Sequence, residues 1–322
     1  MSQRSIIVWV GVVAVIIAAG WYVDSRQVVM PMPTATTSGQ AGSSYGPAPE
    51  FTGITGWLNS APLTMAGLRG KVVLVDFWTY SCINCIRTLP YVTKWYDTYH
   101  EKGFVVVGVH TPEFAFEQDA NNVKDAIARF GIHYPVAQDN DYGTWKAYQN
   151  EYWPAEYLID QSGNIVHEHF GEGEYDVTEN AIRTLLGLPA ASGSAGPDLN
   201  GIQSPEMYFG TDRQQYYVQG QTPKDLNTFT LQGQWQFTSQ YARLDGATGT
   251  IVLKFHSAKV FLVASSAVPA LVSVIVDGKA QPSVTVKDPK LYTLFDSDEY
   301  TDHTIEITVP QSGFQAFTFT FG

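Results

Sequence analysis

The chain has only two cysteines, and they lie three positions apart in the segment Cys82-Ile-Asn-Cys85. Two thiols at this spacing can form a disulfide with each other. Alternatively, one thiol can attack a disulfide of another molecule while the second releases the product. Because there is no third cysteine, no other internal disulfide can form. The pair therefore indicates thiol–disulfide chemistry.

The residues around the pair predict a strand followed by a helix. Residues 72–77 form an apolar run typical of a buried strand, and a helical segment follows from Cys85 to about residue 101. Cys82 would then lie at the helix N-terminus, where unpaired N–H groups and the helix dipole favour negative charge. Cys85 would lie one turn further inside. We therefore assign the attack to Cys82 and the resolving step to Cys85.

Other roles for the two thiols remain open at this stage. A structural disulfide within one turn would close a very short loop and would stabilise the fold little. A zinc site would need two more ligands, for which His167 and His169 on one strand are the available side chains. Inert buried thiols are a third alternative. We predict no metal and no cofactor other than the Cys82–Cys85 redox disulfide.

Composition narrows the classes of function. The 322 residues carry a formal net charge of −12, and the sequence contains no basic patch that could neutralise phosphates. This argues against nucleic-acid binding. The aromatic share of 13% is high and favours a strand-rich architecture.

The N-terminus carries a membrane signal. The segment from Ile6 to Val23 is apolar and uncharged, and as a helix it would span roughly 27 Å, close to the thickness of a bilayer core. Its final Trp21 and Tyr22 suit a membrane interface, which favours an uncleaved single-pass anchor over a cleaved signal peptide. We expect the rest of the chain on the periplasmic side of a bacterial inner membrane, where disulfide chemistry is possible.

Two segments rich in small residues divide the remainder of the chain. Residues 24–50 are predicted to be a flexible tether, because 31–50 are rich in Pro, Gly, Ser, Thr and Ala. Residues 188–203 include Pro189–Pro197 and are predicted to be a linker. The predicted domains are therefore 51–187 and 204–322.

Strand and helix alternate in the first domain, which predicts an α/β fold around a central sheet. The second domain shows period-two alternation and no helical periodicity, which predicts an all-β sandwich of many short strands, jelly-roll-like in type. Asp277-Gly278 is a tight hairpin signal within it. The segments expected in the first domain are strands at 72–77, 104–109, 134–137, 156–159 and 165–170, and helices at 85–101, 121–130, 142–150 and 177–186.

These residues amount to a resemblance. Val75-Asp-Phe-Trp78 followed by Cys82-Ile-Asn-Cys85 resembles the thioredoxin active-site region, Pro90 matches the proline inside its active-site helix, and Trp153-Pro154 matches its cis-proline loop. From residue 51 onward the chain resembles the exported part of the DipZ family, within the TlpA/ResA-type reductases. In that family a carbohydrate-binding-module-like domain follows, which 204–322 resembles. We expect this protein to lack the family's CcdA-like membrane electron carrier, with the single apolar segment in its place.

The resemblance implies roles for further residues. Asp76 matches the buried acid that relays a proton to and from the resolving cysteine, and a carboxylate buried behind a dithiol should have a raised pKa. Pro154 would place the backbone of Trp153 opposite the sulfurs, where it can pair with an extended substrate. Trp78 and Tyr80 are expected at the apolar rim of the same site, with packing as the alternative. Two weaker candidates follow: Glu156 as a tuning residue and His110 as a structural one.

We therefore predict a membrane-anchored, exported thiol–disulfide oxidoreductase. Ile83-Asn84 places no charge between the cysteines, which favours a reductase over an oxidase. Its expected partners are exported proteins that contain disulfides and a CcdA-like electron donor supplied in trans. One alternative is a thiol-dependent peroxidase, although the Thr79-Tyr-Ser-Cys82 segment lacks the expected proline.

The other alternative is an envelope protein that binds glycans or partners through 204–322. The aromatic residues that would form a sugar platform are Trp235, Phe237, Tyr292 and Phe295.

Overall fold

The computed structural model describes residues 44–191, 196–197 and 199–322. The predicted membrane segment Ile6–Val23 and residues 24–43 of the predicted tether lie outside this range. Among the described residues, no helix is both long and apolar enough to cross a membrane.

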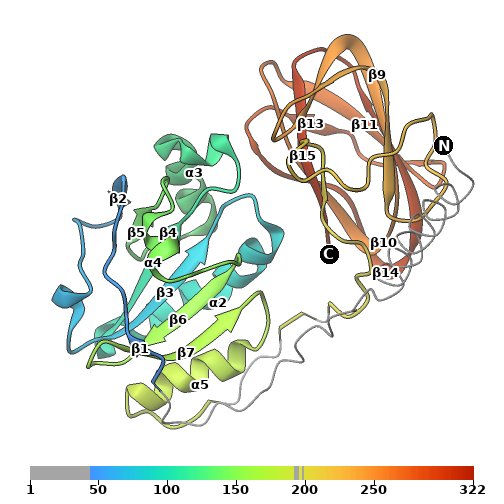
Figure 1. Cartoon of the computed structure of the whole chain (residues 1–322). Coiled ribbons are helices and arrows are strands. Elements are labelled where there is room, and N and C mark those ends of the chain that lie inside the picture. The colour runs from blue at the N-terminus through green and yellow to red at the C-terminus, as the bar shows by residue number, and fades with distance from the viewer. Residues whose placement is uncertain (1–43, 192–195, 198) are drawn as a thin grey trace, which may run out of the picture. The chain divides into compact units, whose positions relative to one another are not determined.

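A seven-stranded sheet organises the first domain, with the strand order β1-β7-β6-β3-β4-β5-β2 (Figure 1). The central strand β3 runs parallel to β4 and antiparallel to β6. Its sequence, Val-Val-Leu-Val-Asp-Phe-Trp, is almost entirely apolar, which suits a central strand. All seven of its residues are buried. The strands are β1 Gly46–Pro47, β2 Gly56–Leu58, β3 Val72–Trp78, β4 Phe104–His110, β5 Val136–Gln138, β6 Ala155–Ile159 and β7 Asn164–Phe170.

The helices are divided between the two faces of this sheet. Apolar residues of α2, α3 and α5 pack against Leu74, Trp78 and Leu158 on one face. On the other face, residues around α4 pack against Val73, Val75 and other strand residues. The helices are α2 Ile83–Tyr99, α3 Ala120–Phe130, α4 Gly143–Ala147 and α5 Tyr175–Leu185, with short 3₁₀ turns at Ala66–Leu68, His100–Lys102 and Ala115–Gln118.

Most predicted elements of this domain are present, with shifted ends. Helix α3 ends as expected at Gly131, whose φ of +65° suits glycine. Strand β5 starts later than predicted, since Tyr134 lies before it, and α4 covers only five residues of the predicted 142–150 helix. Asp139 accounts for the start of α4, because its carboxylate accepts hydrogen bonds from the backbone N–H groups of Thr144 and Trp145.

The end of the predicted tether belongs to the first domain. Gly46 and Pro47 form β1 and pair with β7, and the carboxylate of Glu50 accepts a hydrogen bond from the backbone N–H of Met65. The domain therefore begins before the predicted boundary at residue 51. The Pro, Gly and Ser content indicated a linker, but an edge strand tolerates these residues because only one side of it is paired.

Residues 204–322 form an all-β domain with an eight-stranded sheet. Six of its strands follow the order β12-β11-β14-β10-β15-β8, while β9 pairs with β10 and β13 pairs with β11. Two strands are far longer than the short strands that we predicted, at 25 residues for β10 and 20 for β14. Irregularities in register near Ser257 and Val260 let these strands bend without ending. The strands are β8 Met207–Tyr208, β9 Thr228–Phe237, β10 Ala242–Ser266, β11 Ala270–Val276, β12 Lys279–Ala280, β13 Val284–Val286, β14 Lys290–Val309 and β15 Phe314–Phe321.

The β domain has its own apolar core, which includes residues of β9, β10, β11, β14 and β15. Asp277 and Gly278 both have positive φ and join β11 to β12, as the hairpin signal predicted. The four aromatic residues considered for a sugar platform pack against or within this core: Trp235, Phe237, Tyr292 and Phe295. A glycan-binding role for this domain stays a prediction, but these side chains serve packing.

Candidate redox site

The two cysteines lie at the start of α2, where the predicted strand-to-helix junction places them. Cys82 is the N-cap residue, with extended backbone angles, and its carbonyl accepts the hydrogen bond from Ile86 N at 3.0 Å. Both thiols are free. Cys82 is 9% exposed and Cys85 only 1%. The first sulfur therefore lies nearer to solvent and the second lies inside.

The pKa of the Cys85 thiol is raised well above its ordinary value. Burial is the main cause, and the hydrogen bond and charge of Cys82 and the charge of Asp76 act in the same direction. A hydrogen bond from the backbone of Thr79 opposes them. Cys85 therefore stays protonated at neutral pH and needs a base before it can attack a disulfide.

Two buried carboxyl groups lie behind the dithiol. Asp76 on β3 and Glu156 on β6 are directly opposite each other in register. Neither carboxyl has a hydrogen-bond partner among the described residues. Burial raises the pKa of Asp76 to about 7. Burial, and then the charge of Asp76, raise the pKa of Glu156 to about 8, with the Thr178 hydroxyl opposing. Because two neighbouring buried carboxylates repel each other, the pair holds a proton near neutral pH.

The loop before β6 contains the expected cis peptide bond between Trp153 and Pro154. The indole N–H of Trp153 donates a hydrogen bond to the carbonyl of Thr111 at 3.1 Å, and its ring lies 4.3 Å from that of Trp145. Trp153 packs against the apolar cluster that contains both cysteines. The side chain is thus held in place, while a backbone position opposite the sulfurs stays a prediction.

Trp78 and Tyr80 are buried, which leaves no surface of either for a substrate in this structure. Trp78 packs edge-on against His110, and Tyr80 stacks on the same imidazole at 5.7 Å between ring centroids. Burial lowers the pKa of His110 to about 3, so the ring is neutral. All three therefore act as packing residues in this structure, which is the alternative that the sequence left open.

Glu117 is a site residue that the sequence did not reveal. Its buried carboxylate accepts hydrogen bonds from the backbone N–H and hydroxyl of Ser81, the residue before Cys82, and from the N–H groups of Glu113 and Phe114. Burial, and then the charge of Glu113, raise its pKa to about 7. Glu117 thus ties the loop after β4 to the loop that leads into Cys82. No spacing in the sequence signalled a contact across 36 positions.

Arg87 places a positive charge beside the residues between the cysteines. Its guanidinium donates to the side-chain oxygen of Asn84 at 2.8 Å and forms a two-point contact with Glu172, both distances being 2.7 Å. It also donates to the carbonyl of Phe321 at 3.2 Å. Asn84 itself is neutral, but its side chain is held by this paired cation.

Two aromatic side chains next to the cis-proline loop are exposed. Tyr152 is 52% and Phe170 is 45% accessible, and their ring centroids lie 5.4 Å apart. Phe170 is opposite Ala155, the residue after Pro154. These rings offer the apolar surface near the site that we had expected from Trp78 and Tyr80.

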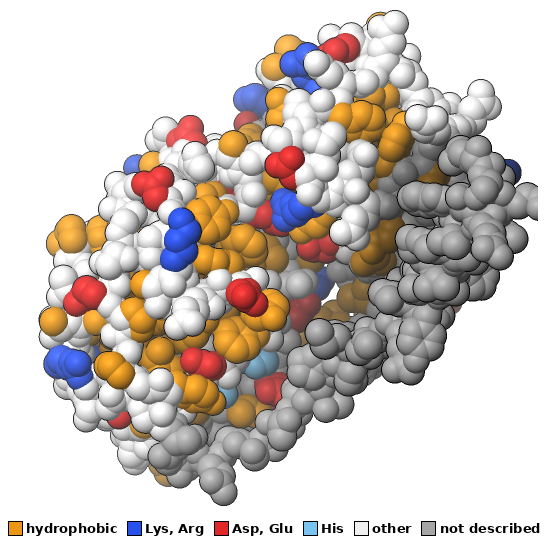
Figure 2. All heavy atoms as spheres, in the orientation of Figure 1, with side chains coloured by type: hydrophobic (Ala, Val, Ile, Leu, Met, Phe, Trp, Pro, Cys, Tyr) orange, Lys and Arg blue, Asp and Glu red, His pale blue; other side chains and the backbone are white. Residues whose placement is uncertain are grey.

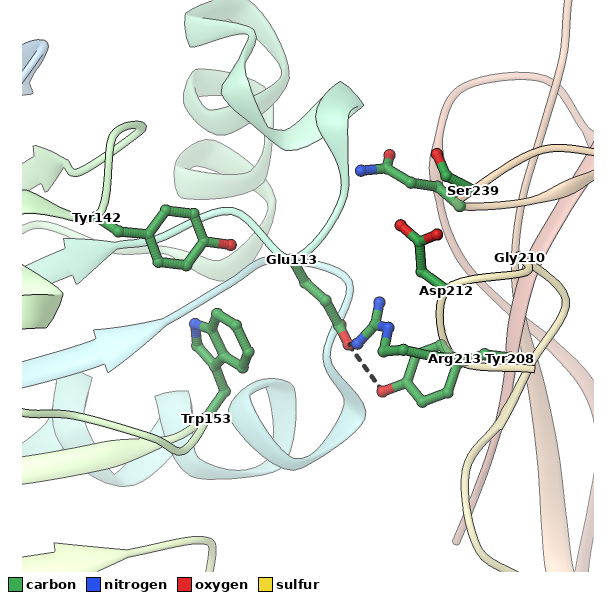
Figure 3. Close-up of a pocket in the computed structure, with 9 residues that line it drawn as sticks. Glu113, Tyr142, Trp153, Tyr208, Gly210, Asp212, Arg213 and Ser239 are labelled. Carbon is green, nitrogen blue, oxygen red and sulfur yellow. Dashed lines mark hydrogen bonds and ion pairs between the residues drawn. The ribbon is translucent and has the colours of Figure 1, made fainter. Parts of the chain in front are cut away.

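A pocket of about 280 Å³ lies beside Trp153 (Figure 3). Tyr142, Trp153 and Glu113 line it from the first domain, and Glu113 accepts hydrogen bonds from Arg213 at 2.7 Å and from Tyr208 at 2.8 Å. The remaining lining residues come from the β domain: Tyr208, Gly210, Asp212, Arg213, Ser239 and Gln240.

Similarity to known proteins agrees with this geometry. The profile of a family described as Redoxin matches residues 40–186, and one described as thioredoxin like C-terminal domain matches 204–322. The thiol-disulfide oxidoreductase YkuV of Bacillus subtilis is 31% identical over 140 residues, which are 44% of this chain and 94% of YkuV. The chain belongs to the thioredoxin-like thiol–disulfide oxidoreductase family.

Within this family, Protein DipZ of Mycobacterium bovis is 42% identical over 303 residues. These are 87% of this chain but only 43% of DipZ, so the chain spans less than half of that relative. A solution structure of a thioredoxin-like protein in the oxidized form is 33% identical, covers 44% of this chain and 95% of its own, and has a TM-score of 0.41.

Proposed function

We propose that this member of the family is a membrane-anchored, exported reductase of protein disulfides that uses Cys82 and Cys85 as its redox pair. One observation carries the proposal. The more accessible thiol lies at the start of α2, while the second thiol is buried beside the Asp76–Glu156 carboxyl pair. This arrangement suits a nucleophile, a resolving thiol and a base.

The reaction follows from these positions. The thiolate of Cys82 attacks a substrate disulfide, and the first substrate sulfur leaves as a thiolate that takes a proton from water. The carboxyl pair then accepts the proton of Cys85, and the Cys85 thiolate attacks the Cys82 sulfur. The mixed disulfide breaks, the second substrate sulfur leaves as a thiolate that takes a proton from water, and a Cys82–Cys85 disulfide forms. The substrate gains two electrons and the protein loses two.

The same proposal includes the redox direction of the cysteine pair and the cellular location of the site. Ile83 and Asn84 carry no charge, and the nearby charge of Arg87 is balanced by Glu172. This favours a reducing couple, because a cation that is already paired with a carboxylate stabilises a neighbouring thiolate less. We place the site on the periplasmic side of the inner membrane, anchored by Ile6–Val23, with a CcdA-like carrier in trans restoring the dithiol.

Exposed Tyr152 and Phe170 give a surface for the substrate beside the cis-proline loop. An unfolded or extended polypeptide can pair with the backbone at Trp153 while its apolar side chains contact these rings. On the face drawn in Figure 2, apolar side chains lie among scattered charges of both signs.

A trapping experiment tests the proposal. The full-length, reduced protein with Cys85→Ser should accumulate a mixed disulfide with a disulfide-containing protein substrate such as insulin, detected by mass on a non-reducing gel. Cys82→Ser should form no adduct and should lose disulfide reductase activity. Retained activity in Cys82→Ser would contradict the proposal. Peroxide consumption without insulin reduction would favour the peroxidase alternative instead.

A further inference from the structure

A line of three titratable side chains runs across the sheet from β3, the strand that leads to the cysteines, through β6 to β7. Asp76 on β3 is opposite Glu156 on β6, and Glu156 is opposite His169 on β7. Residues opposite each other in antiparallel strands point to the same face, with Cβ atoms about 4.5–5.5 Å apart. The three side chains are therefore successive neighbours on the face that α2 and α5 cover.

The polar atoms along this line lack partners. Both oxygens of Asp76, both oxygens of Glu156 and Nε2 of His169 are buried without a hydrogen bond to any described residue. Buried polar groups are nearly always paired, either with protein or with ordered water. Five such atoms on three successive neighbours indicate a shared chain of water and side chains, which can move protons.

The outer end of the line reaches solvent. Nδ1 of His169 lies 3.6 Å from a carboxylate oxygen of Glu174, and the two side chains are 12% and 49% exposed. Burial lowers the pKa of His169, against opposing effects of Glu174 and of the backbone at Gly171 and Glu172. The imidazole is therefore neutral at neutral pH and can accept a proton at its unpartnered nitrogen.

Other polar groups near the line are either engaged or cannot take the proton. His167 lies on the same face, but its Nε2 is hydrogen-bonded to Thr178 Oγ1 at 3.2 Å. Burial, and then the charge of His169, lower the pKa of His167. Tyr175 is hydrogen-bonded to Thr88. The hydroxyl of Tyr134 is unpartnered, but its pKa is raised by burial and by the charges of Asp76, Glu156 and Cys85.

We propose that His169 is the last proton acceptor in a path from Cys85 to solvent. The path runs from Cys85 through Asp76 and Glu156 to His169, and it reaches solvent at Glu174. The inference rests on the proposed redox function. When Cys85 attacks the mixed disulfide, its proton passes to the carboxyl pair, then to His169, and leaves at Glu174. Re-reduction of the disulfide returns a proton by the same path. The path leaves the sheet beside β7, which is two strands away from β3 in the strand order.

Rapid mixing of the reduced protein with the aromatic disulfide 5,5′-dithiobis(2-nitrobenzoate) tests this path. The reagent releases one coloured thiol when Cys82 attacks and a second when Cys85 resolves the adduct. His169→Gln should slow the second release roughly tenfold, which is less than the loss expected when a general base itself is removed. The rate of the first release should not change. His167→Gln is the matched control, with the same residue type on the same strand and face, and should behave as the wild type.

A rescue measurement separates proton transfer from a packing defect. Imidazole in solution should restore the second release in His169→Ala and leave the wild type unchanged. Equal second-phase rates in His169→Gln and the wild type, or equal slowing in His167→Gln, would overturn the path. Absence of a second release in the wild type would instead contradict the proposed function.

Discussion

At the scale of single residues, the buried carboxyl pair links redox chemistry to stability. Asp76 ionises at a pKa of about 3.8 in an ordinary environment and about 7 in the fold. Between these values the unfolded chain has released the proton that the folded protein keeps, so the free energy of unfolding falls as pH rises. Glu156, with a folded pKa of about 8, acts in the same direction. Residues that suit proton transfer thus destabilise the fold at neutral pH.

Asp76→Asn should therefore stabilise the reduced protein at pH 8 by up to roughly 4 kcal/mol, and change it far less at pH 4. The amide has no charge to bury, so the gain appears only where aspartate is ionised in the unfolded chain. Urea unfolding at both pH values measures this, with the exposed Asp141→Asn as control. Parallel pH dependence in wild type and Asp76→Asn would show that Asp76 is not held protonated.

At the scale of elements, β4 makes room for the packing around Asp76. Gly108 is opposite Asp76 in the parallel pair of β3 and β4. A Cβ at Gly108 would lie 2.9 Å from a ring carbon of Tyr134 and 3.0 Å from Nε1 of Trp78. Because glycine has no side chain, the rings of Tyr134 and Trp78 can both approach the backbone at Gly108, the residue opposite Asp76.

Gly108→Ala should destabilise the protein by about 1–3 kcal/mol, because two buried rings must move. Thermal or urea unfolding measures the loss. Gly56→Ala is a suitable control, since its added Cβ would approach only the end of the Gln138 side chain, at 3.3 Å. An equal, small effect of both substitutions would contradict the tight packing at Gly108.

How far the sequence predicted these elements depends on the range of the interactions. The cysteine spacing and the β3 run are local patterns, so the strand and the helix start were expected correctly from them, whereas the cis-proline loop was expected from the resemblance. The contacts of Glu117 and the alignment of His169 with Glu156 depend on loop packing and strand register, which no local pattern encodes. The long strands β10 and β14 were missed because the sequence gives no sign of which irregular residues form bulges rather than turns.

At the scale of the whole molecule, the redox and β domains share apolar and polar contacts. Phe317 of β15 packs against Phe114 and Phe116, with ring centroids 5.2 and 4.7 Å apart. Val263 belongs to the same small cluster. The ion pair of Glu113 with Arg213 lies nearby, at 2.7 Å. We therefore expect the two domains to unfold together.

Phe317→Ala should lower the free energy of unfolding by about 3–5 kcal/mol and should separate unfolding into two transitions. The lost contacts join domains that each keep their own core. Calorimetry of the full chain measures both effects, and Leu271→Ala, at an exposed position, is the control. A single unchanged transition in Phe317→Ala would exclude coupling through this cluster.

The central claim is that Cys82 and Cys85 form a reducing redox pair. Its most direct test is the equilibrium of the purified protein with glutathione, followed by the fraction of Cys82–Cys85 disulfide on mass analysis. We predict a potential near that of thioredoxin, about −270 mV. A value near that of DsbA, about −120 mV, would contradict the account.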